Sequence, residues 1–192
     1  ANGEGVVQDD AEAVRWYRLA SEQGVVDAQC ALGDAYSNGK GLSQDDAEAV
    51  RWLELAADQG HAEAQFSLGG MYSTGRGIPQ DYAEAARWYR HAADQGNSEA
   101  QYALAVLYRD GKGVEQDETE ALYWYGRAVE DGFDQTTLTK AEVKRWEEAE
   151  AAEAQRREEE AATDGDVEKQ VALGHRYATG DGVPQDYLEA AR

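Results

Sequence analysis

The chain has 192 residues, of which 39 are Asp or Glu and 18 are Lys or Arg, so its net charge is −21. This excess of negative charge repels phosphate backbones and anionic membrane surfaces. It argues against a nucleic-acid partner and favours a protein partner, a basic one in particular. The chain has a hydrophobic fraction of 42%, enough for a folded core, and contains only two prolines, which suits a helical structure. No apolar run is long enough for insertion into a membrane.

A repeat of 36 residues dominates the sequence, because whole columns of identical residues recur at this spacing. The repeated columns include Trp16, Trp52, Trp88 and Trp124; Gln8, Gln44, Gln80 and Gln116; and Gly24, Gly60, Gly96 and Gly132. A fixed period of roughly 20 to 50 residues is typical of arrays in which each unit buries its apolar face against the next. We therefore predict an all-α protein, an α/α superhelical solenoid of 36-residue helix-turn-helix repeats.

Residues 62–96 show how one helix pair is encoded. The expected buried stripe of the first helix consists of Ala64, Gln65, Leu68, Gly69 and Tyr72. A glycine inside a helix costs about 1 kcal/mol relative to alanine. Its recurrence at Gly33 and Gly69 therefore indicates close approach of a neighbouring helix.

A glycine turn and an acidic cap separate the two helices of each repeat. Gly75-Arg76-Gly77 is typical of a left-handed helix cap followed by a tight turn. Asp81 with Glu84 is typical of the capped start of a second helix. No strand is expected before the glycines, which disfavours a phosphate-binding loop. The acids recur in register in every repeat, so capping is favoured over acid-base chemistry or calcium binding.

The pattern divides the chain into three parts. Residues 1–132 form an array whose first repeat is incomplete, and residues 165–192 form a further, truncated repeat. Residues 133–164 are either a degenerate repeat or one long charged helix, and the strong helix formers favour a continuous helix over 139–162. We expect helices near 9–23, 26–37, 45–59, 62–73, 81–95, 98–109, 117–131 and 166–178, and no β-sheet. Such a break would leave open array ends, through which head-to-tail self-association is expected.

The recurring columns resemble the Sel-1-like repeat family, a relative of the tetratricopeptide repeats with a longer inter-helix loop. The resemblance covers residues 1–132 and 165–192 and rests on A-x-A-Q-x-x-L-G-x-x-Y, G-x-G and Q-D-x-x-E-A-x-R-W-Y-x-x-A-A-x-Q-G. It implies a superhelix that acts as an adaptor or scaffold in protein complexes and has no catalytic residues. It also favours a bacterial periplasm or cell envelope as the location, with the cytoplasm as the alternative.

Few residues outside the repeat framework offer chemistry. Cys30 is the only cysteine, so there is no disulfide framework and no cysteine zinc site, and we interpret it as a small apolar filler. His61, His91 and His175 are isolated from other metal ligands. We therefore predict no catalytic residue, no cofactor, no metal site and no enzyme activity.

Columns that vary between repeats indicate a partner-binding face, because framework packing leaves them free to suit a partner. We expect an apolar patch rimmed by acids on the first helices, an arrangement typical of interfaces. The predicted partner-binding residues are Asp27, Asp34, Glu63, Phe66, Gly70, Glu99, Tyr102, Val106 and Arg109. Alternatively, Phe66 and Tyr102 pack between neighbouring first helices. The tryptophans are expected to be packing anchors, with Trp52 and Trp88 mostly buried between repeats.

These observations favour a non-catalytic protein–protein interaction scaffold that binds a partner along one face of the superhelix. Two alternatives stay open at this point. One is an inhibitor or immunity-type protein whose acidic surface caps a basic toxin or enzyme. The other is a regulatory arm of a larger envelope or enzyme protein.

Overall fold

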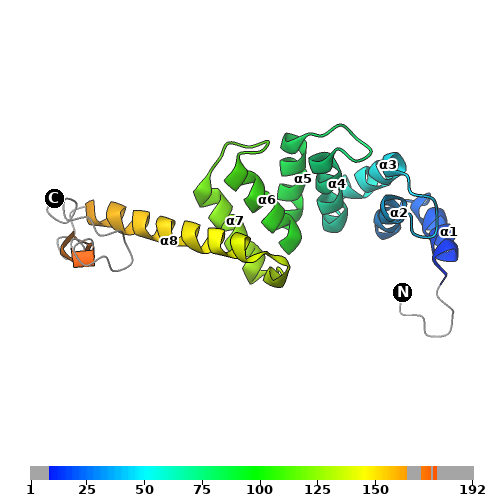
Figure 1. Ribbon diagram of the computed structural model, residues 1–192. Coiled ribbons are helices and arrows are strands. Elements are labelled where there is room, and N and C mark those ends of the chain that lie inside the picture. Colours follow the sequence, from blue (N-terminus) through cyan, green and yellow to red (C-terminus); the bar gives the residue numbers. More distant parts are fainter. Residues whose placement is uncertain (1–8, 164–169, 174, 177–192) are drawn as a thin grey trace. The chain divides into compact units, whose positions relative to one another are not determined.

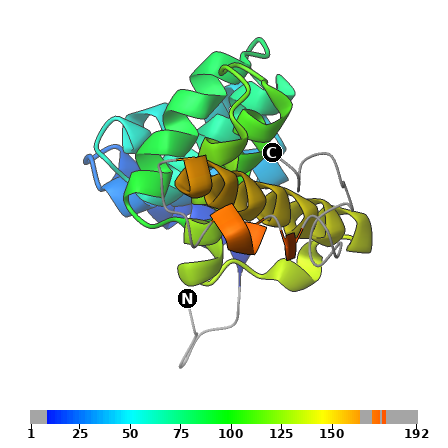
Figure 2. The ribbon, with the colours of Figure 1, turned by 90° about the vertical axis from the view of Figure 1, so that its left-hand side faces the viewer.

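The computed structural model describes residues 9–163, 170–173 and 175–176, and every regular element among them is helical. Seven helices follow one another in chain order (Figure 1), and the view turned by 90° looks along the same row (Figure 2). They are α1 (Asp10–Ser21), α2 (Val26–Asn38), α3 (Asp46–Ala57), α4 (Ala62–Thr74), α5 (Tyr82–Asp94), α6 (Ser98–Asp110) and α7 (Glu118–Glu130). The expected helix pairs are confirmed, with α2 on α3, α4 on α5 and α6 on α7 as the most extensive contacts.

The chain divides into two compact units, one up to Asp134 and one from Gln135 onward. The second contains a short 3₁₀-helix, η1 (Gln135–Thr137), and α8 (Lys140–Thr163). The single helix α8 confirms the continuous helix expected over 139–162. It begins with a capping box, in which Thr139 N donates to Glu142 Oε2 at 2.8 Å and Glu142 N donates to Thr139 Oγ1 at 3.3 Å. The helix expected over 166–178 falls largely outside the described residues, of which 170–173 and 175–176 are helical.

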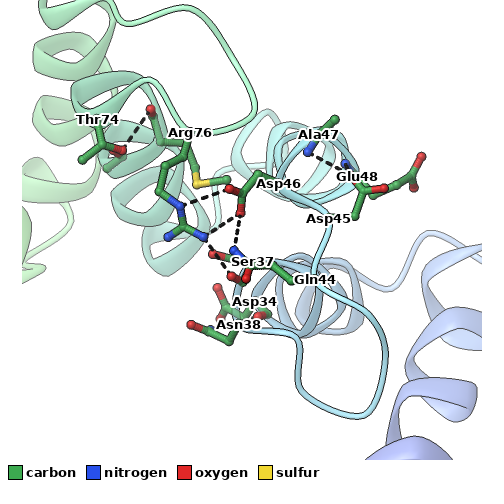
Figure 3. Close-up of polar contacts among 12 residues, drawn as sticks. Asp34, Ser37, Asn38, Gln44, Asp45, Asp46, Ala47, Glu48, Thr74 and Arg76 are labelled. Atoms are coloured by element: carbon green, nitrogen blue, oxygen red, sulfur yellow. Dashed lines mark hydrogen bonds and ion pairs between the residues drawn. The ribbon is translucent and has the colours of Figure 1, made fainter.

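The acidic caps and glycine turns form as predicted. Asp45 accepts hydrogen bonds from the backbone N–H groups of Ala47 and Glu48, both at 3.1 Å (Figure 3). The other second helices start at the equivalent caps Asp9, Asp81 and Asp117. The first helices end at Gly39, Gly75 and Gly111, which adopt the left-handed conformation that disfavours any residue with a Cβ.

A glycine in the buried stripe lets the second helix of a repeat approach the first. A Cβ at Gly69 would lie 2.6 Å from Tyr89 Cδ1, and a Cβ at Gly33 would lie 2.7 Å from Leu53 Cγ. Both distances are well inside van der Waals contact, so a larger residue would force the second helix to shift. This confirms the close approach inferred from the repeated glycine.

The second glycine of each loop touches the preceding repeat. A Cβ at Gly77 would lie 2.2 Å from the carbonyl oxygen of Asp46, at the start of α3. Beside it, Arg76 Nη2 donates to Asp46 Oδ1 at 2.6 Å and to the carbonyl oxygen of Ser37 at 2.9 Å (Figure 3). This backbone contact and ion pair hold neighbouring repeats in register. The contact recurs at the equivalent glycines, Gly41 and Gly113.

The tryptophan column supplies apolar contacts between repeats, but its members differ in burial. Trp52 is 8% exposed and packs with Val14 of the preceding repeat. Trp124 is also buried, whereas Trp88 is only partly buried. Trp16 is 59% exposed, so the prediction that every tryptophan anchors two repeats is wrong for this residue. Trp52, at the equivalent position, packs instead against Val14 of the preceding repeat.

We expect the stability of the array to follow this order of burial. Trp52→Ala should lower the free energy of unfolding by about 3–5 kcal/mol, because it removes a large side chain from a packed cluster. Trp88→Ala should cost less, and Trp16→Ala should change stability by about 0.5 kcal/mol or less. Urea unfolding followed by circular dichroism measures all three, and equal costs at Trp16 and Trp52 would contradict the packing described.

A polar ladder runs through the otherwise apolar stack. Gln65 is buried in α4, where its Nε2 donates to the carbonyl oxygen of Ala57 at 3.1 Å. Its Oε1 accepts a hydrogen bond from Gln95 Nε2 at 2.7 Å, so both polar atoms of the amide are satisfied. Gln29 and Gln59 form the same contact one repeat earlier, also at 2.7 Å.

The repeat that contains α6 and α7 departs from this ladder. Gln101 is fully buried at the position of Gln65, but Asp131 occupies the position of Gln95. Asp131 Oδ2 accepts from Gln101 Nε2 at 2.7 Å, and a carboxylate has no N–H to return. Gln101 Oε1 is therefore buried without a hydrogen-bond partner among the described residues. A buried acceptor left in this state costs about 1–3 kcal/mol.

Asp131→Gln should restore the missing bond and raise the free energy of unfolding by about 1 kcal/mol. The change also removes a negative charge from the C-terminal end of α7, where it is unfavourable. The ion pair lost with Arg127, at 3.7 Å on the surface, is worth little. Chemical denaturation tests this, with Gln95→Asp as the matched control that creates the same defect at Gln65 and lowers stability. If neither variant changes stability, the ladder does not contribute as described.

Candidate functional site

Equivalent positions on the three first helices form the candidate binding surface, here called the first-helix face. It consists of Asp27 and Asp34 on α2; Glu63, Phe66 and Gly70 on α4; and Glu99, Tyr102, Val106 and Arg109 on α6. The carboxylates of Asp27, Glu63 and Glu99 are exposed, and Asp34, Gly70 and Val106 are partly exposed. Residues in equivalent positions of a stacked array lie on one side of it, so these side chains can meet one extended partner.

The two aromatic rings of the face both pack and retain some exposure. Phe66 lies 5.9 Å, between ring centroids, from Tyr89 on the second helix of its own repeat. Tyr102 stacks on Phe133 at 4.4 Å and lies 6.4 Å from Tyr125. The rings therefore contact second helices, rather than only one another across neighbouring first helices, and each remains partly exposed.

Arg109 was expected to be available for contact with a partner, but the structure shows it buried. Its side chain is 8% exposed, and its Nε donates to Asp110 Oδ1 at 2.8 Å. The hydrogen bond from Arg109 holds the pKa of the Asp110 carboxyl below its usual range. The charge of Arg109 is thus already engaged within α6, which leaves the exposed part of the face acidic.

The carboxylates of α2 and α4 act on one another across the repeat boundary. Burial, and then the charge of Glu63, raise the pKa of Asp34, and a 3.5 Å hydrogen bond from Ser67 Oγ offsets only part of this. Burial raises the pKa of the Cys30 thiol to about 12, with Asp34, Glu63 and Asp27 adding to the shift. Cys30 is thus a buried, protonated side chain, which confirms its interpretation as a filler. Its pKa also reports a negative potential at this part of the face.

His61 joins α4 to α2 at the edge of the same face. Its Nδ1 accepts a hydrogen bond from Ala64 N at 3.2 Å and thereby caps α4. Its Nε2, which then carries the proton, lies 3.4 Å from Asp27 Oδ1. In the sequence, His61 holds the same repeat position as Asn97, whose side chain caps α6. This equivalence is the feature of the sequence that could have predicted the cap.

Gly70 leaves space in the middle of the face. A Cβ there would meet only the hydroxyl of Tyr89, at 3.8 Å, which is an ordinary contact. Packing therefore does not require glycine at this position, unlike at Gly69. An alanine would favour the helix by about 1 kcal/mol. Asp34 and Val106 hold the equivalent positions on α2 and α6. Because Gly70 has no side chain, the surface of α4 is recessed at this position.

Among the residues that the structure describes, no group of three or more His, Cys, Asp or Glu side chains could hold a metal ion. None of the described helices combines the length and the apolar character needed to cross a bilayer.

Asp34→Asn should raise the stability of the protein at neutral pH. The folded-state pKa of Asp34 lies above its unfolded value, so its contribution to stability is most favourable in acid and is lost as pH rises through the folded pKa. The neutral amide avoids this loss and can still accept from Ser67. Thermal unfolding across pH measures the effect, and the advantage of the variant should shrink toward about pH 4. A variant less stable than wild type at neutral pH would contradict the electrostatic cost described for the Asp34 carboxylate.

Stacked helix pairs of one length, joined by glycine turns, define this chain as an α/α solenoid repeat protein. The model of the Sel1 repeat matches residues 1–25, 26–61, 62–97, 98–133 and 170–192. The chain belongs to the Sel1 repeat family, as its resemblance predicted, and proteins of this family are generally protein-interaction scaffolds. The residues between the last two matches include α8.

Solved structures support the same assignment. The chain is 35% identical to c5321, a protective antigen of uropathogenic Escherichia coli with an SLR fold, over 98% of this chain and 33% of that one, with a TM-score of 0.65. It thus spans a third of the length of that protein. A Sel1 repeat protein from Oxalobacter formigenes is also 35% identical, over 98% and 78% of the two chains, with a TM-score of 0.66. Helicobacter pylori cysteine rich protein B shares the fold at 23% identity, over 69% and 96%, with a TM-score of 0.53. No curated protein sequence matches the chain.

Proposed function

We propose that this chain is a non-catalytic scaffold that binds a basic partner protein along the first-helix face. The observation that carries the proposal is the row of carboxylates that successive first helices present, beginning with Asp27, Glu63 and Glu99. The one arginine of the face, Arg109, is buried against Asp110. A surface of one sign attracts a partner of the opposite sign and accelerates the encounter between them.

The energetics of Asp34 support a cationic contact at this place. Its carboxylate is partly buried and repelled by Glu63, so the unbound protein carries a local electrostatic cost. A lysine or arginine of the partner would relieve that cost and form charge-assisted hydrogen bonds. Residues that lower stability without a structural return are typical of binding sites.

The shape of the face supports an extended contact rather than a single pocket. Gly70 leaves room between two side chains of its column, and the partly exposed rings of Phe66 and Tyr102 lie nearby on α4 and α6. Aromatic rings within a polar rim commonly supply much of the binding energy of an interface. The partner segment would run across the repeats, with apolar contacts at the rings and cationic contacts at the acids.

Gly70→Arg tests the proposal, because it fills the space and places a positive charge on the acidic face without disturbing the core. Immobilised wild-type protein should capture one or more basic proteins from the source cell at low salt, and Gly70→Arg should lose at least about 90% of them, equivalent to about 1.4 kcal/mol. The matched control is Leu55→Arg, the same substitution at an exposed position of the second helix α3, which should capture as wild type does.

The salt dependence of capture discriminates between kinds of partner. Association of a basic partner should slow sharply as salt rises, because screening weakens the attraction. Several captured proteins would support a scaffold, and one dominant basic protein would support an inhibitor. Equal capture by wild type and Gly70→Arg would contradict binding at the first-helix face.

A further inference from the structure

A surface groove of about 400 Å³ lies between α1 and the loop that follows α2. Its lining includes Val14, Arg15, Arg18, Leu19, Glu22 and Leu42. None of the residues of the first-helix face lines it. The groove combines two arginines with aliphatic side chains, in a protein whose net charge is −21.

Arg18 is the unusual member of this groove. Its Nη2 donates to the hydroxyl of Tyr36 at 3.0 Å, which fixes the guanidinium against a neutral partner. It forms no ion pair with any carboxylate that the structure describes. A guanidinium has five N–H donors, and one hydrogen bond to a phenol leaves most of them facing the groove.

The equivalent arginine two repeats later shows what Arg18 lacks. Arg90 also donates to a tyrosine hydroxyl, that of Tyr108, but in addition it lies 3.8 Å from Glu120 and 5.2 Å from the ring of Trp124. Glu120 is available to Arg90 because the residue three positions after it is Tyr123 rather than an arginine. Arg90 therefore has an ion pair and an aromatic contact on the next repeat.

A competing arginine removes that carboxylate at Arg18. The residue equivalent to Glu120 is Glu48, and Arg51, three positions after it, pairs with Glu48 at 3.4 Å. Arg51 also lies 4.7 Å from the centroid of the Trp52 ring, whereas at the equivalent Trp124 it is Arg90 that contacts the ring, at 5.2 Å. Among the residues that the structure describes, Arg18 is thus left with a hydrogen bond to Tyr36 and no ion pair.

The repeat between them shows that an arginine at this position is not a general property of the fold. Glu54 holds the position of Arg18 there, and burial followed by the charge of Asp58 raises the pKa of its carboxyl. Three equivalent positions therefore carry an uncompensated arginine, a glutamate and a neutralised arginine. Of these three positions, that of Arg18 carries a cation with no ion pair among the described residues, and it lines the groove beside α1.

The rest of the lining supplies an apolar contact. Leu19 is 44% exposed, and Val14 and Leu42 belong to a hydrophobic cluster. Arg15 pairs with Glu12 at 3.4 Å, with both side chains exposed, so this weak pair can open for a ligand. Glu22 also lines the groove, one helical turn beyond Arg18.

We infer that this groove binds an acidic peptide segment of a partner protein, in which a carboxylate lies beside a large aliphatic side chain. The carboxylate pairs with Arg18, and the aliphatic side chain contacts Leu19 and Leu42. Sites for small molecules enclose about 70–90% of their ligand. A groove lined by exposed Arg15, Leu19 and Glu22 cannot enclose one, whereas a peptide needs only one side covered. The chain would then bind partners of opposite charge on two different surfaces.

The probe for this test is an acetylated peptide, Gly-Ser-Gly-Glu-Leu-Gly-Ser-Gly, titrated into the ¹⁵N-labelled protein and followed by NMR. We expect shifts of the amides of Arg18, Leu19 and Leu42, and about tenfold weaker binding when the glutamate of the peptide is replaced by glutamine. Arg18→Gln should weaken binding by a similar factor, and it retains a donor for Tyr36. Leu19→Ser should weaken binding about fivefold through lost apolar contact, while leaving the core intact.

Leu55→Ser is the matched control, since Leu55 holds the column of Leu19 one repeat later, is 42% exposed, and belongs to the repeat with Glu54 in place of Arg18. Its affinity should equal that of wild type. Equal affinity for the glutamate and glutamine peptides, shifts confined to the first-helix face, or no shifts at about 1 mM peptide would each overturn the inference. The outcome is independent of the Gly70→Arg experiment, because the two surfaces share no residue.

Discussion

The contact between a loop glycine and the start of the preceding second helix is the constraint on which this array depends. At Gly77 the backbone of one repeat touches the backbone of Asp46, leaving no room for a side chain between them. Backbone contacts of this kind cannot adapt by rotamer changes, so the spacing of successive repeats is nearly constant. The Arg76–Asp46 ion pair and the burial of Trp52 against Val14 are arranged around this spacing. The first-helix face and the α1 groove both result from it.

A constant framework makes the exceptions informative. One position carries Arg18, Glu54 and Arg90 in successive repeats, and because the framework columns around it recur, the differences in charge compensation can be compared directly. In the same way Asp131 stands where a glutamine closes the polar ladder in two other repeats. Function in a repeat protein is carried by such departures, because the framework residues are committed to packing.

The acidic first-helix face and the groove at Arg18 use electrostatics in different ways. On the first-helix face several like charges accumulate, and burial followed by the charge of Glu63 raises the pKa of Asp34. In the groove Arg18 forms no ion pair with a described carboxylate, while Arg51 pairs with Glu48. On each surface a charged group, Asp34 or Arg18, can still form an ion pair with a partner. A partner that supplies the opposite charge gains affinity without any change of fold.

The sequence alone determined the helix pairs, their caps and glycine turns, the close approach at Gly33 and Gly69, and the family, because these features are local or repeat with the period. It also placed the acids of the candidate face in one column. Only the tertiary structure decided that Trp16 is exposed while Trp52 is buried, that Arg109 is engaged with Asp110, and that Phe66 packs on Tyr89. A repeat period shows which residues are equivalent. The burial and the pairing of a residue, however, depend on both its own helix and the helix that packs against it. They depend on which side chain the neighbouring helix presents.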